Sequence, residues 1–237
     1  MTRRLLTFMF LSAAALALPT ATRPATPEKT PPPSAPNPDL DAAAAASAAH
    51  GWIELIRDYA LKDWQRVSLP GGTPPDSRSS WRYDQSTGIL HCAGVDLPEM
   101  LLHHTERGDG IFRVEWRYAG SPTKPSAGIL VRTKPDASAW HEAALTPNVL
   151  GMLGGARLSP AGATSRFNTG RRRPELMRKP GEWNIVELVC TGSRILLHVN
   201  GVVTADWREC TVSSGLVGLR ADGAPVEFRS IRFKPLP

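Results

Sequence analysis

The sequence predicts an all-β domain, built as a sandwich or a barrel, that begins near Gly51. Short runs with alternating apolar and polar residues, or with many β-branched residues, recur from there to the C-terminus. Gly, Pro, Asp and Asn separate these runs and mark turns. Only "IELIRDYALKDW" has a helical period, and it could hold a turn. Ten or more short strands in one stretch are typical of a single β-sandwich or barrel.

Residues 1–18 are typical of a secretory signal peptide. Arg3 and Arg4 precede an apolar run from Leu5 to Leu18, and small residues lie near its end. The run is shorter than the ~20 residues that a membrane-spanning helix needs. A single uncleaved anchor is the alternative. We therefore expect an exported protein, either periplasmic or extracellular.

Residues 19–50 are predicted to be a disordered linker. The stretch "PTATRPATPEKTPPPSAPNP" is rich in Pro, Thr and Ala and has no apolar periodicity. Such a segment buries too little apolar surface to offset the entropy lost on ordering it. The following "DLDAAAAASAAH" forms either a helical turn or two, or more linker. The folded domain is accordingly expected over residues 51–237.

The charge balance indicates neither a strongly basic nor a strongly acidic protein. Lys and Arg outnumber Asp and Glu by 28 to 22, which is a mild excess. This excess does not by itself indicate nucleic acid binding, and we expect none. Part of it lies in "RRRPELMRK". There Arg171, Arg172 and Arg173 form either a solvated loop or a contact for anionic glycans or the cell envelope.

The cysteines and histidines predict no metal site and no cofactor. Three cysteines, Cys92, Cys190 and Cys210, are too few for a disulfide scaffold. A bridge between Cys190 and Cys210 stays open, because an exported protein meets an oxidising compartment. His103 and His104 are adjacent, and adjacent residues on a strand point to opposite faces, so both do not easily bind one metal ion.

The predicted strands follow one another with clear turn signals between them. "CTGSR" and "HVNGVV" mark two of the turns, and the Asn-Gly pair in the second is a strong hairpin signal. In chain order the strand runs are "GILHCAG", "MLLHH", "IFRVEWRY", "AGILVRT", "AWHEAAL", "WNIVELVC", "RILLHVN", "VVTADW", "GLVGLRA" and "VEFRSIRF".

Residues 111–118, "IFRVEWRY", have the clearest alternation. The apolar set is Phe112, Val114, Trp116 and Tyr118, and the charged set is Arg113, Glu115 and Arg117. On a strand these two sets point to opposite faces, so the apolar set should face the core. The charged set then faces either open solvent or the floor of a site.

The alternation also sets a register for pairing with the next strands. Suppose that strand 112–118 pairs antiparallel with strand 128–133, with Glu115 opposite Arg132. The apolar residues of both strands then share one side, whereas a slip by one residue would bury Arg132. Placing Glu142 of the following strand opposite Arg132 gives the row Glu115–Arg132–Glu142. Because neighbouring strands lie about 4.8 Å apart, the two carboxylates would be roughly 10 Å apart.

Such a row either seats a sugar or forms a charge ladder on a solvated face. An Arg between two carboxylates offers a rigid fork of donors to ring oxygens or to a ketone. One carboxylate would act as base and the other as proton donor, with Arg132 near the developing negative charge. In a ladder, each pair would contribute only about 0.2–1 kcal/mol.

Several motifs resemble those of the 3-keto-disaccharide hydrolase domain family, which was long catalogued as a domain of unknown function. "GWIELIRDYALKDWQRV" resembles the opening of that domain. "GILHCAG", "FRVEWRY", "SAGILVR", "KPGEWNIVELVCTGSRILLHVNG" and "GLVGLRADGAPVEFRSIRF" then follow in the family's order. The resemblance covers essentially all of residues 51–237.

The resemblance implies a fold and an activity. The implied fold is a concanavalin A-like jelly roll of two antiparallel sheets with one concave face. The implied activity is hydrolysis of 3-keto-glycosides by acid/base chemistry in an exported bacterial protein. The sequence departs from the family at Ala144, where a Gln is usual, and at Arg220, where Gln is commoner. A non-catalytic glycan-binding module of the same fold is therefore the alternative.

The remaining candidate contacts to sugar come from the predicted polar face and from the resemblance. Trp140 shares its strand parity with Glu142, so it could stack on a sugar ring or pack at the rim of the core. His141 has the opposite parity and is expected to be a buried histidine rather than a catalytic one. The candidate substrate-binding residues are Trp140, His104, Arg117 and Arg220.

Overall fold

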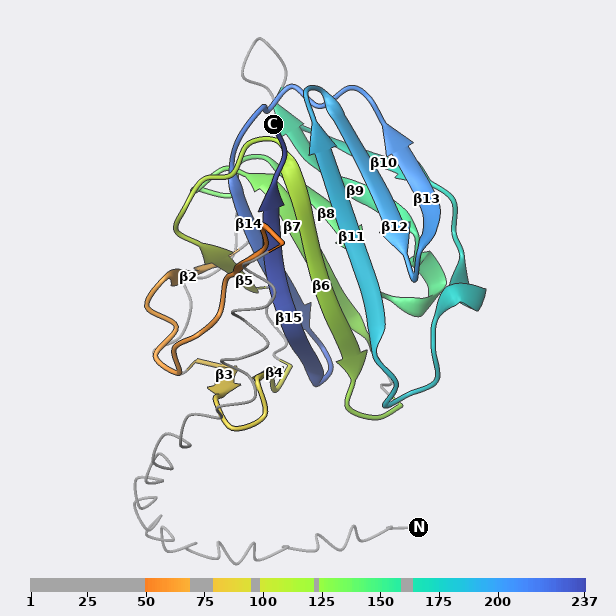
Figure 1. Ribbon diagram of the computed structural model, residues 1–237. Helices are drawn as coiled ribbons and strands as arrows, with labels where there is room; N and C mark the ends of the chain where they lie inside the picture. Colours follow the sequence, from red (N-terminus) through yellow and green to blue (C-terminus); the bar gives the residue numbers. More distant parts are fainter. Residues whose placement is uncertain (1–49, 69–78, 95–98, 122–123, 159–163) are drawn as a thin grey trace, which may run out of the picture. The chain divides into compact units, whose positions relative to one another are not determined.

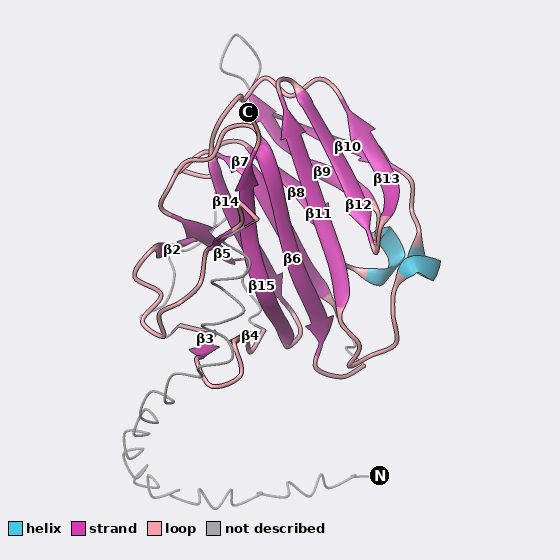
Figure 2. Ribbon diagram, viewed as in Figure 1, coloured by secondary structure: helices cyan, strands magenta, loops and turns pink. Residues whose placement is uncertain are grey.

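The chain folds into two antiparallel β-sheets that pack face to face. The computed structural model describes residues 50–68, 79–94, 99–121, 124–158 and 164–237. Within these ranges the helical elements are two short 3-10 turns, η1 (Pro147–Val149) and η2 (Pro174–Leu176). Figures 1 and 2 show the two layers of strands. The predicted all-β fold of two antiparallel sheets is confirmed.

The front sheet carries the strand with the clearest alternation, β6, near its centre. Its order is β13-β12-β11-β6-β15-β4-β3, and β1 also pairs with β15. The bounds are β1 (Ile53–Glu54), β3 (Trp81–Asp84), β4 (Ile89–Cys92), β6 (Gly110–Tyr118), β11 (Asn184–Thr191), β12 (Arg194–Val199), β13 (Val202–Trp207) and β15 (Val226–Pro235).

The back sheet has the order β10-β9-β8-β7-β14-β5-β2. Its bounds are β2 (Trp64–Ser68), β5 (Glu99–His103), β7 (Ser126–Thr133), β8 (Trp140–Ala144), β9 (Met152–Leu158), β10 (Thr164–Gly170) and β14 (Leu216–Asp222). Three consecutive hairpins of this sheet, β7–β8, β8–β9 and β9–β10, bring four strands side by side at one end.

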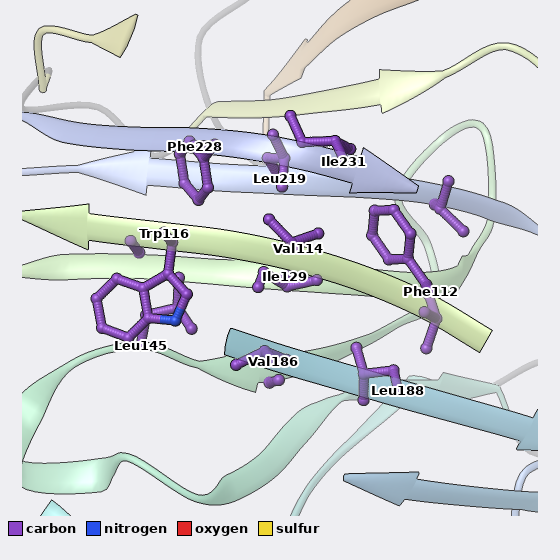
Figure 3. Packing of buried hydrophobic residues seen from close by; sticks show 14 of the residues in the cluster. Phe112, Val114, Trp116, Ile129, Leu145, Val186, Leu188, Leu219, Phe228 and Ile231 are labelled. Atoms are coloured by element: carbon purple, nitrogen blue, oxygen red, sulfur yellow. The ribbon is translucent and has the colours of Figure 1, made fainter. Parts of the chain in front are cut away.

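The main core lies between the sheets. The apolar set of β6 points into it, as predicted, and alternates strictly with half-exposed neighbours. Trp116 and Phe112 are fully buried and pack against side chains from both layers (Figure 3). Burying one such side chain contributes about 1.5–3 kcal/mol, so the alternation of β6 fixes which face of the front sheet turns inward.

The "HVNGVV" hairpin is confirmed between β12 and β13. Asn200 and Gly201 both have positive φ, at 49° and 83°. This is the combination that a two-residue type I′ turn requires, and Asn-Gly is the pair that best tolerates it. The Asn200 side chain also accepts the Ile185 N–H at 2.8 Å, which ties the turn to the neighbouring strand β11.

The predicted pairing of residues 112–118 with residues 128–133 is wrong. β6 pairs with β11 and β15 in the front sheet, whereas β7 pairs with β8 and β14 in the back sheet. The chain crosses from one layer to the other between β6 and β7. Strands that follow one another in sequence often pair, but a sandwich also joins its sheets through such crossings.

The predicted signal peptide, residues 1–18, and nearly all of the predicted linker, residues 19–50, lie outside the described residues. Among the described residues, no helix has the length and apolar character needed to cross a membrane. Cys92, Cys190 and Cys210 are free thiols, and all three are buried.

Candidate functional site

A hollow of about 330 Å³ opens on the outer face of the back sheet, away from the main core. Its walls come from β8, β9 and β10, from η1, and from one side chain of β14. The lining residues are Trp140, Glu142, Ala144, Val149, Met152, Gly154, Gly155, Arg166, Phe167, Asn168 and Arg220. Small-molecule sites typically measure about 300–1,000 Å³, so the hollow fits a short ligand.

Glu142 stands at the floor of this hollow. As predicted, it shares one face of β8 with Trp140 and Ala144, and all three line the hollow. In the sheet, Glu142 lies opposite Leu130 on one side and Gly154 on the other. Because Gly154 has no side chain, the floor beside the carboxylate stays open, and Asn168 lies directly beyond it on β10.

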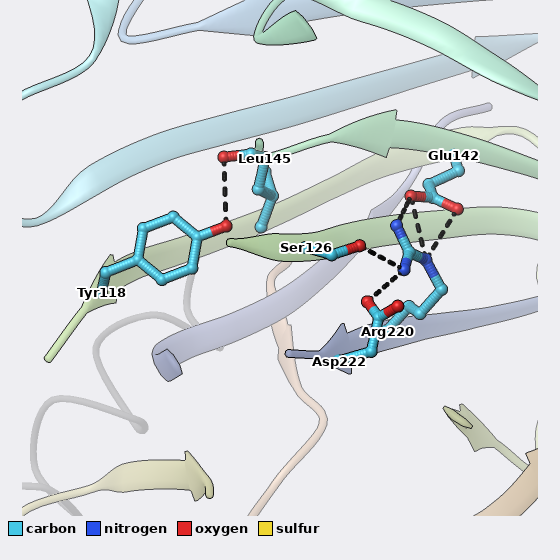
Figure 4. Close-up of polar contacts among 6 residues, drawn as sticks. All are labelled: Tyr118, Ser126, Glu142, Leu145, Arg220 and Asp222. Atoms are coloured by element: carbon cyan, nitrogen blue, oxygen red, sulfur yellow. Dashed lines mark hydrogen bonds and ion pairs between the residues drawn. The ribbon is translucent and has the colours of Figure 1, made fainter. Parts of the chain in front are cut away.

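Arg220 reaches Glu142 from two strands away (Figure 4). Its Nε donates to both carboxylate oxygens at 3.1 Å, and its Nη2 donates to Oε1 at 2.7 Å. Its Nη1 donates to Ser126 Oγ at 2.9 Å and to Asp222. The guanidinium therefore holds the Glu142 carboxylate in one orientation, with two further acceptors behind it.

A glycine makes this reach across the sheet feasible. Gly128 of β7 lies opposite Arg220 on one side and Ala144 on the other. A Cβ at Gly128 would lie 2.2 Å from Glu142 Oε1, which no side chain could tolerate without displacing the carboxylate. The ion pair thus occupies space that only a residue without a side chain leaves free.

The environment keeps Arg220 charged. Burial alone would lower the pKa of this guanidinium, but the charges of Glu142 and Asp222 and the hydrogen bonds to Glu142 raise it above its ordinary value. Tyr118 belongs to β6 of the front sheet. Its hydroxyl donates to the carbonyl oxygen of Leu145, just after β8, at 3.5 Å (Figure 4). Burial raises the pKa of Tyr118, so this phenol is a neutral donor.

The other end of the hollow is formed by Trp140 and Arg166. They lie on either side of Ala156, in register across β8, β9 and β10. The Arg166 guanidinium sits 4.3 Å over the Trp140 ring. Trp140 is only 3% exposed, because it also packs in a second apolar cluster with Leu130 and Ala156. Of the two expected roles, the packed one therefore holds, and Arg166 covers the ring.

The predicted row Glu115–Arg132–Glu142 does not form. Glu115 lies on the outer face of the front sheet, where Arg229 Nε donates to its Oε2 at 2.8 Å. It belongs to the charge ladder that was the alternative to a sugar site, together with Arg113 and Arg117. Glu142 therefore stands in the hollow without Glu115 or Arg132.

Arg132 is buried and ties the two sheets together. Its side chain is 1% exposed. Nη1 donates to the Gly192 carbonyl oxygen at 2.6 Å, and Nη2 donates to Asp109 Oδ1 at 2.8 Å. A shift in register with β14 and a φ of 48° at Arg132 turn it off the polar face. Gly215 packs against this backbone, where a Cβ would come within 2.6 Å of the Arg132 carbonyl carbon.

Three other predicted residues lie outside the hollow. Arg117 Nε donates to Glu227 at 2.6 Å on the front sheet, and its guanidinium sits 4.3 Å over Trp183. His104 is exposed in the turn after β5. His141 is fully buried on the core side, as expected, and burial lowers its pKa to about 4.

The basic segment 171–173 follows β10 directly. Arg171 and Arg172 are exposed, and Arg173 pairs with Glu175. None of these three residues lines the hollow. In the part of the chain that the structure describes, no group of three or more His, Cys, Asp or Glu side chains could hold a metal ion.

Sequence reasoning missed Arg166, Asn168 and Gly154. Their strands, β9 and β10, contain a Gly-Gly pair and a largely polar run, so neither looked like a strand. The only available signal was the basic character of residues 157–179, which gives no register. Arg220, by contrast, was identified from the resemblance and does line the hollow.

Several solved structures with a similar fold are proteins whose names refer to carbohydrate. The carbohydrate-binding module CBM66 from Bacillus subtilis is 14% identical, with a TM-score of 0.55, over 73% of this chain and 95% of that one. A proposed glycosyl hydrolase from Parabacteroides distasonis is 13% identical, with a TM-score of 0.57, over 81% and 97%. A prokaryotic β-1,3-1,4-glucanase (lichenase) derived from a mouse hindgut metagenome is 12% identical, with a TM-score of 0.51, over 78% and 98%.

At these identities the likeness establishes the fold, a jelly-roll sandwich of the concanavalin A-like kind. The comparison with curated proteins gave no match. A family model, however, covers residues 51–234, which is most of the chain and nearly all of the expected domain. The resemblance found in the sequence is thereby confirmed, and the chain belongs to the 3-keto-alpha-glucoside-1,2-lyase-like domain family.

Proposed function

We propose that the domain binds a sugar in the hollow and cleaves 3-keto-glycosides by acid/base chemistry, with Glu142 as the base. The observation that carries this proposal is the Glu142 carboxylate, oriented by Arg220 and facing an open floor at Gly154. Family membership supports the substrate class, because the family is described by a 3-keto-α-glucoside. We further propose that the protein is exported, as residues 1–18 predict.

The chemistry begins at the carbon between the ketone and the anomeric centre. The ketone acidifies the hydrogen on that carbon, and the Glu142 carboxylate takes this proton. Negative charge then develops on the ketone oxygen, where the Arg220 guanidinium supplies a fixed positive charge. As the bond from the anomeric carbon to the leaving oxygen breaks, that oxygen takes a proton from water. The hydroxide left by that water then adds to the anomeric carbon of the enone, and Glu142 returns its proton to the neighbouring carbon, which regenerates the carboxylate.

A non-catalytic glycan-binding module is the second candidate, and two observations favour it. All three hydrogen bonds from Arg220 to Glu142 must loosen before the carboxylate can leave its position. Ala144 also lines the hollow where the family pattern has a Gln amide, so one donor and acceptor for a sugar hydroxyl is missing. A module would use the same floor and the same Asn168 amide for binding alone.

Turnover of a 3-keto-disaccharide separates the two candidates. The purified domain is incubated with this substrate, and release of free monosaccharide is followed. If Glu142 is the base, Glu142→Gln should lower turnover by about 10²- to 10⁴-fold. Glu187→Gln is the matched control, because it removes a similarly half-buried carboxylate from an arginine pair on the front sheet.

Saturable binding without turnover in the wild-type protein would favour the module. Turnover that survives Glu142→Gln would contradict the role of Glu142. If the wild-type protein shows no binding and no turnover, that result would count against any sugar site in the hollow. In that case, contact with anionic glycans or the envelope through Arg171, Arg172 and Arg173 would be the remaining proposal, tested by loss of binding at higher salt.

A further inference from the structure

We infer that the hollow selects a sugar that carries an anionic group, and that Arg166 is the residue that binds this group. The inference rests on the proposed function, because it places the sugar over Gly154 beside Glu142. It goes beyond that function by naming a charge on the ligand that neither the family description nor the fold implies.

The charges at the two ends of the hollow differ in how they are compensated. At one end, Glu142 and Arg220 form an ion pair, and Asp222 approaches Arg220 from a side that does not line the hollow. At the other end, no carboxylate among the described residues lies within ion-pair distance of Arg166. Arg157, on the neighbouring strand, does have such a partner, because its Nη1 donates to Glu209 at 2.9 Å. Among the residues that the structure describes, Arg166 is therefore a cation without a carboxylate partner.

Arg166 is exposed, and the contact that the structure gives for its guanidinium is the one with the Trp140 ring. Its guanidinium lies over the Trp140 ring, and contact with a ring does not neutralise a guanidinium. Ala156 stands between them with a side chain small enough for Arg166 to cross β9. A guanidinium that lies over this ring at the edge of the hollow can still offer paired donors to a carboxylate or phosphate.

The spacing suits one sugar ring. Trp140 and Glu142 are two residues apart on one strand, which places their rows about 7 Å from each other. A ring over Gly154 would lie between Glu142 and Asn168, within its own row. An exocyclic carboxylate or phosphate on that ring would then extend into the neighbouring row, where Arg166 stands. A neutral hydroxymethyl group at the same place would leave this charge unmatched.

The test compares sugars that differ in one exocyclic group. Calorimetry at low ionic strength measures binding of methyl α-D-glucuronide, methyl α-D-glucoside 6-phosphate and methyl α-D-glucoside to the full domain. We expect at least one of the two anionic sugars to bind about tenfold more tightly than the glucoside, with the difference shrinking as salt is added. Whichever anionic sugar binds more tightly identifies a carboxylate or a phosphate as the preferred group.

Variants of the domain test whether Arg166 is responsible for the preference for an anionic sugar. Arg166→Met keeps an aliphatic stem over Trp140 and should bind all three sugars with the affinity of the glucoside, whereas Arg166→Lys should restore part of the difference. Arg82→Gln removes the same charge from an exposed site on β3 of the front sheet and should change nothing. Equal affinities in the wild-type protein, or a preference that survives Arg166→Met, would overturn the inference.

The outcome also separates this inference from the function on which it rests. If a 3-keto-glucoside is turned over while the anionic and neutral sugars bind equally, only the charge preference is wrong. If no sugar binds and none is turned over, the proposed function is wrong as well.

Discussion

Removing the Asp109 carboxylate tests whether Arg132 holds the two sheets together. Asp109 accepts from Arg132 Nη2 at 2.8 Å and, through its other oxygen, from the Gly192 N–H at 2.9 Å. The Arg132 side chain is 1% exposed in the wild-type protein, and in Asp109→Ala its guanidinium would keep only the Gly192 carbonyl oxygen as an acceptor. A buried charge that loses its partner is costly, so the variant should be markedly less stable.

The expected loss of stability in Asp109→Ala follows from the exposure of Arg132 and Asp109. Breaking a fully buried ion pair by removing one partner costs about 3–5 kcal/mol. Asp109 itself is 36% exposed, so water can partly replace its carboxylate, and we expect about 2–3 kcal/mol. Glu209→Gln is the control, because it breaks the Arg157 pair, whose acidic partner is 72% exposed, and should cost less than about 1 kcal/mol.

Urea unfolding at constant pH measures these differences as shifts in the midpoint. The double variant Asp109→Ala with Arg132→Met should be less destabilised than the two single variants together, because it also removes the stranded charge. Effects that add to within about 0.5 kcal/mol, as for independent sites, would refute the proposed role of the Arg132–Asp109 pair in holding the sheets together. Sugar binding by the folded variant should be retained, since neither residue lines the hollow.

Two further predictions concern the hollow and the core. Gly128→Ala should displace the Glu142 carboxylate, costing about 1–3 kcal/mol in stability and weakening sugar binding, whereas Gly120→Ala, with open space around it, should do neither. His141, with its pKa lowered to about 4, binds a proton between pH 4 and 6.5 only when unfolded, so it makes stability rise with pH there. Glu54, with its pKa raised by burial to about 7, makes stability fall between pH 4.5 and 7. Urea midpoints over this range should therefore rise less steeply with pH in His141→Phe and more steeply in Glu54→Gln, and unchanged slopes in both variants would contradict these assignments.

The faces of the strands could be predicted from the sequence because burial enforces them. A slip of one residue in β6 would put Glu115 in the core and Trp116 in water, and the cost of that exchange fixes the parity. The same logic placed Glu142 on the outer face and His141 on the inner face of β8, and both placements are confirmed.

The partners of the strands could not be predicted in the same way. The alternation in β6 fixes which of its faces turns toward the core, and this face stays buried whichever strand pairs with β6. The alternation therefore does not say which sheet β7 joins. The predicted position of Arg132 on the polar face was wrong for a second reason. The register shift near it depends on Gly215, more than eighty residues away in sequence, and nothing in "AGILVRT" itself signals a residue with positive φ.

The hollow depends as much on small residues as on charged ones. Because these residues lie far apart in the sequence, no short motif predicted the hollow. Arg220 crosses one strand over Gly128, and Arg166 crosses another over Ala156. The two positions that depart from the family pattern suggested by the resemblance, Ala144 and Arg220, lie on either side of Gly128 in the sheet. A long side chain at 144 would compete with Arg220 for the space above that glycine. With an ion pair where the family pattern implies amides, we expect ligand selection in this chain to depend on charge more than on neutral hydrogen bonds.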